Sequence, residues 1–280
     1  MIPSGRPFYK MSGSGNDFVM VDARNEPPGG LTEPAVIHRI CARATGVGAD
    51  GIVFLEPSES ADIRLTYLNA DGSPADFCGN ATLCTTRLSV ELGAVDPRGF
   101  RIQTDSGIVA ARMRSDQPEI DLPRVSDGEA DMADHIPLLS GERRIGYYLV
   151  GVPHLVILCD DVSTVDVVGR GRPLRSHPSM RDHGANVNFV SKGSDGRWRY
   201  RTYERGVEAE TLACGSGSVA TAILLASWPE TGVQLGEPVE IETRSGKLLR
   251  VTLKSAADGG FMPSLSGEGR VVFKGQLSEI

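Results

Sequence analysis

The stretch ACGSGSVATAI, residues 213–223, places a cysteine directly before a glycine- and serine-rich run that leads into an apolar segment. We expect the apolar segment to form a helix that ends at Pro229. Cys214 then lies at the entrance of this helix, where backbone N–H groups point outward and the helix dipole favours negative charge. Such a position suits a thiolate, an anionic ligand, or both.

A second copy of this arrangement decides the fold. Cys78 in FCGNATLC, residues 77–84, precedes Cys214 by 136 residues. Three further segments repeat at the same offset: GNDFVMV with GVPHLVI, GADGIVF with GANVNFV, and TYLNADG with TYERGVE. IQTDSG and IETRSG lie 139 residues apart. Five matches in one order predict two copies of one supersecondary plan.

The local patterns within each copy predict an α+β fold. Short β-branched runs bounded by Gly and Asp, such as those at residues 17–23, 50–56 and 62–69, are typical of strands. Helices are expected within residues 32–44 and after each of the two cysteines, the first of these ending at Gly93. Each half should therefore hold several strands and two helices.

The polar, turn-like stretch between about residues 123 and 143 is the expected boundary between the halves. We predict one domain of residues 1–125 plus 266–280 carrying Cys78, and a second of residues 126–265 carrying Cys214. A duplicated fold usually packs about a pseudo-twofold axis, so the two cysteines are expected to line one cleft.

Composition limits the classes of function. The chain has 280 residues, is 40% hydrophobic and carries a formal charge of −7, with no basic run of the kind that binds nucleic acid. The N-terminus has no signal-like apolar region, and the longest apolar stretch falls short of the ~20 residues that span a bilayer. Five scattered cysteines do not form a disulfide framework. We expect a cytoplasmic protein with reduced thiols, a small-molecule partner, no nucleic acid and no membrane.

Two thiols at helix entrances suit proton transfer at carbon. A helix N-terminus stabilises a thiolate, so one cysteine can act as a base while its symmetry mate acts as an acid. Taking a proton from one face of a carbon and returning one to the other inverts that carbon without a cofactor. The N–H groups of Gly79, Asn80, Gly215 and Ser216 can meanwhile hold a carboxylate.

GSGNDFVMVD, TGVGADG, LNADGSPADFCGN, GANVNFV and YERGVEAETLACGSGS together resemble the diaminopimelate epimerase family, over most of the chain. The resemblance implies two similar domains related by a pseudo-twofold axis, each with a mixed or antiparallel sheet curled around a central helix, and an active-site cleft between them. It implies that Cys78 and Cys214 are the acid/base pair that interconverts LL- and meso-diaminopimelate for lysine and peptidoglycan precursor synthesis. It also implies no cofactor, no metal, a homodimer, and a C-terminal strand that returns to the first half.

The resemblance further implies the substrate-binding residues. Side-chain contacts are expected from Asn16, Asn69, Asn186, Glu204 and Arg205, and main-chain contacts from Gly79, Asn80, Gly215 and Ser216. His154 and Glu204 match positions that tune the cysteines. Amides and a guanidinium suit the distant carboxylate of a two-headed substrate, and a glutamate suits its ammonium group.

The chain departs from the family pattern at three positions that bear on substrate specificity. Val152 stands where many members have Asn, Gly51 where Gln is common, and Leu83 where Arg is usual. These changes leave the proton-transfer centre intact. They keep open a racemase of another amino acid, such as histidine, on the same fold.

Other interpretations stay open from the residues alone. Cys41, Cys84 and Cys159 lie in apolar patterns and are expected to be inert core residues. His154 on its own could be an ordinary hydrogen-bonded strand residue. A non-catalytic amino-acid-binding protein is an alternative from another class. Zinc or phosphate sites are disfavoured, because the spacings and the lysine that they require are lacking.

Overall fold

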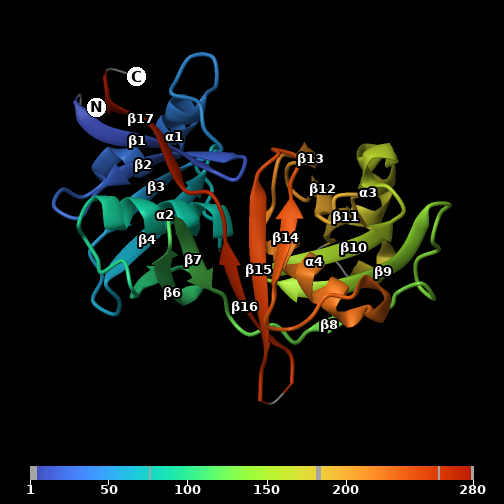
Figure 1. The fold of residues 1–280 in the computed structure, drawn as a ribbon. Coiled ribbons are helices and arrows are strands. Elements are labelled where there is room, and N and C mark those ends of the chain that lie inside the picture. The colour runs from blue at the N-terminus through green and yellow to red at the C-terminus, as the bar shows by residue number, and fades with distance from the viewer. Residues whose placement is uncertain (1–4, 76, 181–183, 258, 279–280) are drawn as a thin grey trace. The chain divides into compact units, whose positions relative to one another are not determined.

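The computed structural model describes residues 5–75, 77–180, 184–257 and 259–278. The chain forms two compact units, Met1–Asp121 with Ser266–Ile280, and Leu122–Leu265. Within each unit, strands surround one long helix and a second helix lies apart from it (Figure 1). None of the helices in the described residues is long and apolar enough to cross a membrane.

The first unit is a mixed sheet around one buried helix. Its strands are β1 (Arg6–Gly13), β2 (Asn16–Asp22), β3 (Gly51–Glu56), β4 (Ile63–Asn69), β5 (Phe100–Thr104), β6 (Gly107–Arg114), β7 (Gln117–Asp121) and β17 (Arg270–Leu277). Its helices are η1 (Gly29–Thr32), α1 (Pro34–Cys41) and α2 (Gly79–Glu91). The strands pair in the order β17, β1, β2, β3, β4, β5, β6, β7, with β2–β3 and β4–β5 parallel and the others antiparallel. Strand β17, near the C-terminus, pairs with β1 in this unit.

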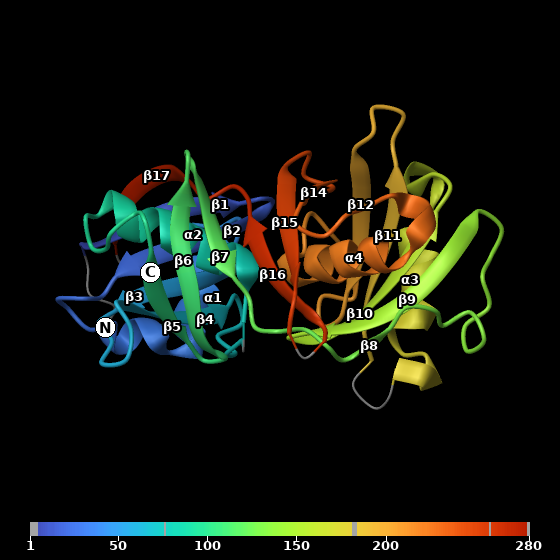
Figure 2. The same ribbon diagram turned by 60° about the horizontal axis from the view of Figure 1, so that its bottom comes forward.

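Helix α2 is the centre of this unit. It contacts β1 and β17 near one end of the strand order as well as β6 and β7 at the other, so the sheet curls around it (Figure 2). The helix ends where predicted, because Gly93 adopts a left-handed conformation with φ of 63° that suits glycine. Nearly every residue of its first three turns is buried.

The second unit repeats this plan. Its strands are β8 (Gly128–Glu129), β9 (Glu142–Val150), β10 (Val152–Cys159), β11 (Asn186–Lys192), β12 (Trp198–Glu204), β13 (Ala209–Thr211), β14 (Pro238–Glu242), β15 (Leu248–Ser255) and β16 (Phe261–Ser266). Its helices are η2 (Val162–Thr164), α3 (Val167–Arg175), η3 (Pro178–Met180), α4 (Gly215–Ser227) and η4 (Pro229–Thr231). As in the first unit, the sheet alternates antiparallel and parallel pairs from β9–β10 through β10–β11, β11–β12 and β12–β14 to β14–β15.

The predicted internal repeat is confirmed at the level of single residues. Helices α2 and α4 each have 13 residues and start one residue after a cysteine. Cys78 has φ −133° and ψ 109°, and Cys214 has φ −136° and ψ 114°. Thr82 Oγ1 donates to the carbonyl of Cys78 at 2.9 Å, and Ser218 Oγ donates to that of Cys214 at 3.0 Å. The two cysteines therefore occupy equivalent places at the helix entrances.

The core of the second unit includes part of the polar segment that precedes β9. Met132 and Ile136 are buried and pack with Ile145, Leu155 and Ile157. The backbone N–H of Met132 donates to the carbonyl of Ile145 at 2.8 Å. This segment therefore contributes to the second unit's core and is not only a connection.

Candidate active site

Cys78 caps the N-terminus of α2 through its sulfur. Its Sγ accepts a hydrogen bond from the backbone N–H of Ala81 at 3.5 Å, and its side chain is partly exposed. The first turn of a helix leaves such N–H groups without intrahelical partners, so a sulfur at this place meets donors and the positive end of the helix dipole. This is the environment that favours a thiolate.

Asn16 is brought to Cys78's helix by the tight turn between β1 and β2. Gly13 pairs with Asn16 across the hairpin, and the two residues between them, Ser14 and Gly15, have φ of 56° and 122°. Two positive φ values in a two-residue loop are typical of hairpins whose twist matches that of the strands. Asn16 Oδ1 accepts from Asn80 Nδ2 at 2.7 Å, linking the hairpin to the first turn of α2.

Asp50 fixes the orientation of both amides. Its Oδ2 lies 3.0 Å from Asn16 Nδ2. Because an ionised carboxylate can only accept hydrogen bonds, Asn16 must turn its NH₂ to Asp50 and its oxygen to Asn80. Asn80 in turn directs its oxygen away from Asn16, and this buried Oδ1 has no hydrogen-bond partner among the described residues. Asn80 Oδ1 is thus a hydrogen-bond acceptor at the N-terminus of α2 that points away from Asn16.

A charged cluster supports Asp50. Arg43 donates to Asp50 at 2.5 Å and to both oxygens of Asp17 at 3.0 and 2.9 Å, and Lys10 donates to Asp17 at 2.5 Å. Burial alone would raise the pKa of Asp17, but the bonds from Arg43 and Lys10 outweigh it and hold that pKa below its usual value. The backbone N–H groups of Asp17 and Asp50 also donate to each other's carboxylates. Ion pairs and hydrogen bonds therefore join the β1–β2 hairpin to the loop that carries Asp50.

Asn69 lies at the end of β4, where the chain turns through the NADGS loop. Its Nδ2 donates to Ser73 Oγ at 3.1 Å, and its backbone N–H donates to the carbonyl of Ser73 at 2.9 Å. Its side chain is partly exposed. Asn69 is thus held by its own loop, within the same unit as Cys78.

Cys214 has a different set of neighbours. It is 8% exposed, and its Sγ lies 3.6 Å from Ser216 Oγ. Ser216 Oγ lies 3.0 Å from Nε2 of the fully buried His154. Burial, with the charge of Arg205 as a further cause, lowers the pKa of His154 to about 3. The imidazole is therefore neutral over the physiological pH range and can serve as a fixed hydrogen-bonding group.

Asn186, Glu204 and Arg205 meet at the ends of β11 and β12. Asn186 Oδ1 accepts from the backbone N–H of Arg205 at 2.7 Å, which holds the turn after β12. Glu204 accepts a short hydrogen bond from Thr211 Oγ1 on the neighbouring β13. The structure therefore brings together His154, Asn186, Glu204, Arg205 and Ser216 in the unit that carries Cys214. Asn16, Asn69 and Asn80 lie in the unit that carries Cys78.

Comparison with known proteins identifies the family of the chain. The family model described as diaminopimelate epimerase matches residues 8–133 and 146–267. The chain belongs to the diaminopimelate epimerase family. A diaminopimelate epimerase of Gemmatimonas aurantiaca is 49% identical over 97% of this chain and 99% of its own length. One of Aquifex aeolicus is 36% identical over 97% and 98%. The predicted family and isomerase class are confirmed.

Solved structures share the duplicated fold at low sequence identity. A phenazine biosynthesis protein of the PhzF family from Bacillus anthracis aligns with a TM-score of 0.74 at 18% identity, over 97% of this chain and 98% of that one. A hydroxyproline epimerase from Agrobacterium vitis aligns with a TM-score of 0.68 at 17% identity, over 98% and 93%. These likenesses confirm the predicted α+β fold of two repeated domains.

Two departures from the diaminopimelate epimerase pattern have structural counterparts. A Cβ atom at Gly51 would lie 2.4 Å from the carbonyl of Leu68 and 2.5 Å from the ring of Tyr67. The space that a glutamine side chain would need is thus already filled. Leu83 is fully buried in α2, where an arginine would require a buried partner. Val152 is partly buried at the first position of β10.

Sequence reasoning missed the residues behind the predicted contacts. The sequence patterns do not mark Asp50 and Arg43 in the first unit, or Asn188 and Tyr200 in the second, as site residues. A signal for one of them was present, because Asp50 and Asn186 are equivalent under the offset of 136 residues. The others are recognisable only once strand pairing has placed them beside a site residue.

The pKa values of the remaining three thiols are raised by burial. Burial raises the pKa of Cys41 to about 11 and that of Cys159 to about 12, and it raises that of the fully buried Cys84 well above its usual value. Thiols of this kind are protonated at neutral pH and poor nucleophiles. Their predicted role as inert core residues agrees with this environment.

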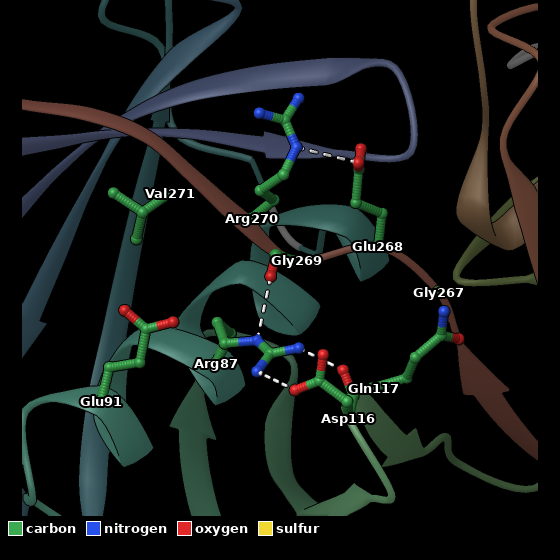
Figure 3. A pocket seen from close by; sticks show the side chains of 9 residues that line it. All are labelled: Arg87, Glu91, Asp116, Gln117, Gly267, Glu268, Gly269, Arg270 and Val271. Atoms are coloured by element: carbon green, nitrogen blue, oxygen red, sulfur yellow. Dashed lines mark hydrogen bonds and ion pairs between the residues drawn. The ribbon is translucent and has the colours of Figure 1, made fainter.

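The first unit also has an open groove of about 340 Å³ (Figure 3). Arg87 donates to the carbonyl of Gly269 at 3.1 Å and to the carboxylate of Asp116 at 2.9 Å, and Arg270 pairs with Glu268 at 3.1 Å. Both guanidinium groups are thus satisfied by the protein itself. The groove includes none of the predicted site residues.

Proposed function

We propose that the protein is a cofactor-independent diaminopimelate epimerase in which Cys78 and Cys214 transfer protons at one α-carbon of the substrate. The observation that carries the proposal is the equivalent placement of the two cysteines, each directly before a buried 13-residue helix with nearly the same backbone angles. Family membership supplies the substrate, LL- and meso-diaminopimelate. The reaction serves lysine and peptidoglycan precursor synthesis.

The proposed reaction needs one base and one acid. The thiolate of one cysteine takes the α-proton, so the C–H bond breaks and an S–H bond forms, and the electron pair stays on the substrate. The thiol of the other cysteine then gives its proton to the opposite face of the carbon and becomes the thiolate. The roles exchange in the reverse direction, because each step retraces itself.

The helix entrances are proposed to stabilise the charge that develops as the α-proton leaves. Backbone N–H groups of Gly79, Asn80, Gly215 and Ser216 suit the carboxylate next to the reacting carbon. The buried Oδ1 of Asn80 suits an N–H donor of the substrate, because an unpaired buried acceptor costs about 1–3 kcal/mol until it is satisfied.

The other predicted contacts complete the proposal. Asn16, Asn69 and Asn186 are proposed to bind the distal end of the substrate together with Arg205, and Glu204 its ammonium group. His154 and Glu204 are proposed to tune the cysteines. Val152 offers no polar side chain in this set, so binding of the distal carboxylate would rely on the other groups.

We also propose that the enzyme is a cytoplasmic homodimer. This follows the family resemblance. Light scattering of the purified protein at micromolar concentration should give about twice the 29.9 kDa mass of one chain. A mass near that of one chain would contradict the dimer without affecting the proposed reaction.

The function is tested by proton NMR of the reduced protein in deuterated water. LL-diaminopimelate should lose its α-proton signal as the meso isomer appears, whereas L-histidine, L-glutamate and L-proline should not change. Cys78→Ala and Cys214→Ala should each abolish inversion. Cys41→Ala is the matched control, because this thiol is buried in the core of the same unit as Cys78, and it should retain turnover.

Two other outcomes would replace the proposal. Exchange with another amino acid alone would keep the two-thiol reaction and make the protein a racemase. Binding of diaminopimelate that survives both cysteine substitutions, with no exchange in the wild type, would indicate a non-catalytic binding protein.

A further inference from the structure

A buried polar cluster lies beside Cys214 on the strands that carry His154. His154 on β10, Asn188 on β11, and Tyr200 and Thr202 on β12 are at most 1% exposed. Asn188 is paired with Thr202 across β11 and β12, and β10 lies on the other side of β11. Burying four polar side chains in an apolar core costs free energy unless each is hydrogen-bonded. Their hydrogen bonds therefore determine how each side chain is oriented.

Asn188 has one permitted orientation. Its Nδ2 lies 2.7 Å from the carbonyl oxygen of Leu155, which can only accept. Its Oδ1 accepts from Tyr200 Oη at 2.7 Å and from Thr202 Oγ1 at 3.0 Å. An exchange of nitrogen and oxygen would set two oxygens against each other at Leu155. The amide is therefore fixed with its nitrogen toward β10.

This orientation determines the tautomer of His154. Asn188 Nδ2 lies 3.3 Å from His154 Nδ1, so Nδ1 must accept. Since burial and the charge of Arg205 lower the pKa of His154 to about 3, the ring has a single proton, which is left on Nε2. That N–H donates to Ser216 Oγ at 3.0 Å, and the hydroxyl of Ser216 can donate its own proton to Cys214 Sγ at 3.6 Å.

We propose that Asn188, held by Tyr200 and Thr202, is a positioning residue that fixes His154 as the Nε2–H tautomer and directs a chain of donors through Ser216 onto the sulfur of Cys214. The chain stabilises Cys214 as a thiolate, because every hydrogen bond in it points toward the sulfur. The consequence for turnover rests on the proposed function. The tautomer and the reactivity of the thiol do not.

The donor chain that leads to Cys214 has no counterpart at the equivalent positions of the first unit. At the positions equivalent to His154 and Asn188 under the repeat, the first unit has Phe18 and Ile52, which offer no side-chain hydrogen bond. Cys78 instead accepts from the backbone N–H of Ala81. The two cysteines thus have equivalent backbone positions but different hydrogen-bond donors. A backbone N–H of the helix donates to Cys78, whereas a series of hydrogen-bonded side chains leads to Cys214.

The tautomer is measured by NMR of the ¹⁵N-labelled, reduced protein, with His154→Gln to assign the ring signals. In the wild type, long-range ¹H–¹⁵N correlations should show His154 with Nδ1 unprotonated and Nε2 protonated from pH 5 to pH 9. Asn188→Asp should move the proton to Nδ1, because a carboxylate there demands a donor. A wild-type ring protonated on Nδ1 would overturn the proposal without need of any variant.

The effect on the thiol is measured by the pH dependence of iodoacetamide alkylation at Cys214 in a Cys78→Ala background. The raised pKa values of Cys41, Cys84 and Cys159 keep these three thiols protonated and slow to react. Asn188→Leu should raise the midpoint of Cys214 alkylation by about half to one pH unit, because the donor chain loses its fixed direction. Asn188→Leu changes none of the charged and titratable residues near Cys214, which are Tyr200, Glu204, Arg205 and His154. The hydroxyl of Tyr200 also interacts with Cys214 directly, so Tyr200 is left unchanged in this test.

Ser191→Ala is the matched control, since Ser191 is a buried, hydrogen-bonded residue on β11 whose Oγ binds the backbone N–H of Val162. It should leave the alkylation midpoint unchanged. A folded Asn188→Leu variant with the wild-type midpoint would contradict the proposal. If epimerase activity is absent but the tautomer and the alkylation midpoint are as expected, only the proposed function is rejected.

Discussion

Asp50 illustrates how one residue can orient several others. Its carboxylate can only accept, so it turns the amide of Asn16, and Asn16 turns that of Asn80. The result is a buried acceptor of defined direction at the entrance of α2. Arg43 holds Asp50 in place through a hydrogen bond of 2.5 Å.

Replacing Asp50 with Ala should therefore reduce epimerase activity. A hydrogen bond to a charged group contributes about 1.5–3 kcal/mol, so we expect kcat/KM to fall by roughly tenfold to a hundredfold. Asp50→Asn should lose less, because one amide oxygen can still accept from Asn16.

The control is Asp96→Ala. In the wild type the Asp96 carboxylate pairs with Arg98 on the surface. Such exposed pairs contribute little, so its kcat/KM should equal that of the wild type. An Asp50→Ala variant with wild-type kcat/KM would show that the amides do not depend on Asp50.

At the scale of residues, the sequence predicts the two cysteines as site residues but not the residues that orient their neighbours. Cys78 and Cys214 could be singled out because repeat, glycines and helix pattern coincide along the chain. Asp50 and Asn188 act through the direction of hydrogen bonds across strands, and that direction exists only once the strands are paired. A pattern of residue types does not contain it.

At the scale of elements, the start of α4 lies close to buried side chains of β11 and β12. A Cβ atom at Gly217 would lie 2.2 Å from Tyr200 Oη, 2.6 Å from Asn188 Oδ1 and 3.3 Å from Cys214 Sγ. Glycine at this position thus lets the helix entrance approach the buried polar cluster.

Gly217→Ala should destabilise the protein even though alanine favours helices. The added methyl group has no free space, and overpacking of this kind typically costs about 1–3 kcal/mol. Urea denaturation should show a lower midpoint with an unchanged slope. Gly99→Ala is the comparison, since no atom lies within 4 Å of its Cβ position, and its stability should stay within about 0.5 kcal/mol of the wild type. Equal stability of the two variants would mean that the helix entrance has room to move.

Most elements could be predicted because their signals are local. Gly93 and Pro229 end the helices that follow the cysteines, and alternating apolar residues mark β4. The parallel pairing of β4 with β5 and of β12 with β14 joins segments separated by a whole helix, which no local pattern encodes. The repeat of IQTDSG and IETRSG indicated only that the two pairings would be alike.

At the scale of the whole molecule, the burial of neutral His154 links stability to pH. Its pKa is about 3 in the folded protein and about 6.5 when unfolded. The unfolded state therefore binds the proton first, so the stability contributed by this group is complete above pH 6.5 and is lost as the pH falls toward 3.

Between pH 7 and pH 4.5 this linkage should lower the free energy of unfolding by about 2–3 kcal/mol. Urea unfolding of the wild type and of His154→Gln at both pH values separates this contribution from that of the carboxylates. The variant should lose less stability than the wild type over the same interval. Equal losses would mean that the imidazole is charged in the folded protein.

The molecule consists of two copies of one unit, and the proposed reaction uses their two cysteines as unlike partners. The most direct test is the distribution of deuterium after a few per cent conversion of LL-diaminopimelate in deuterated water. Two thiols on opposite faces predict deuterium at the inverted carbon of the meso product, while the recovered LL substrate keeps its protium. Deuterium entering the LL substrate as fast as the product would contradict the two-thiol mechanism, because it would require one group to remove and return the proton on the same face.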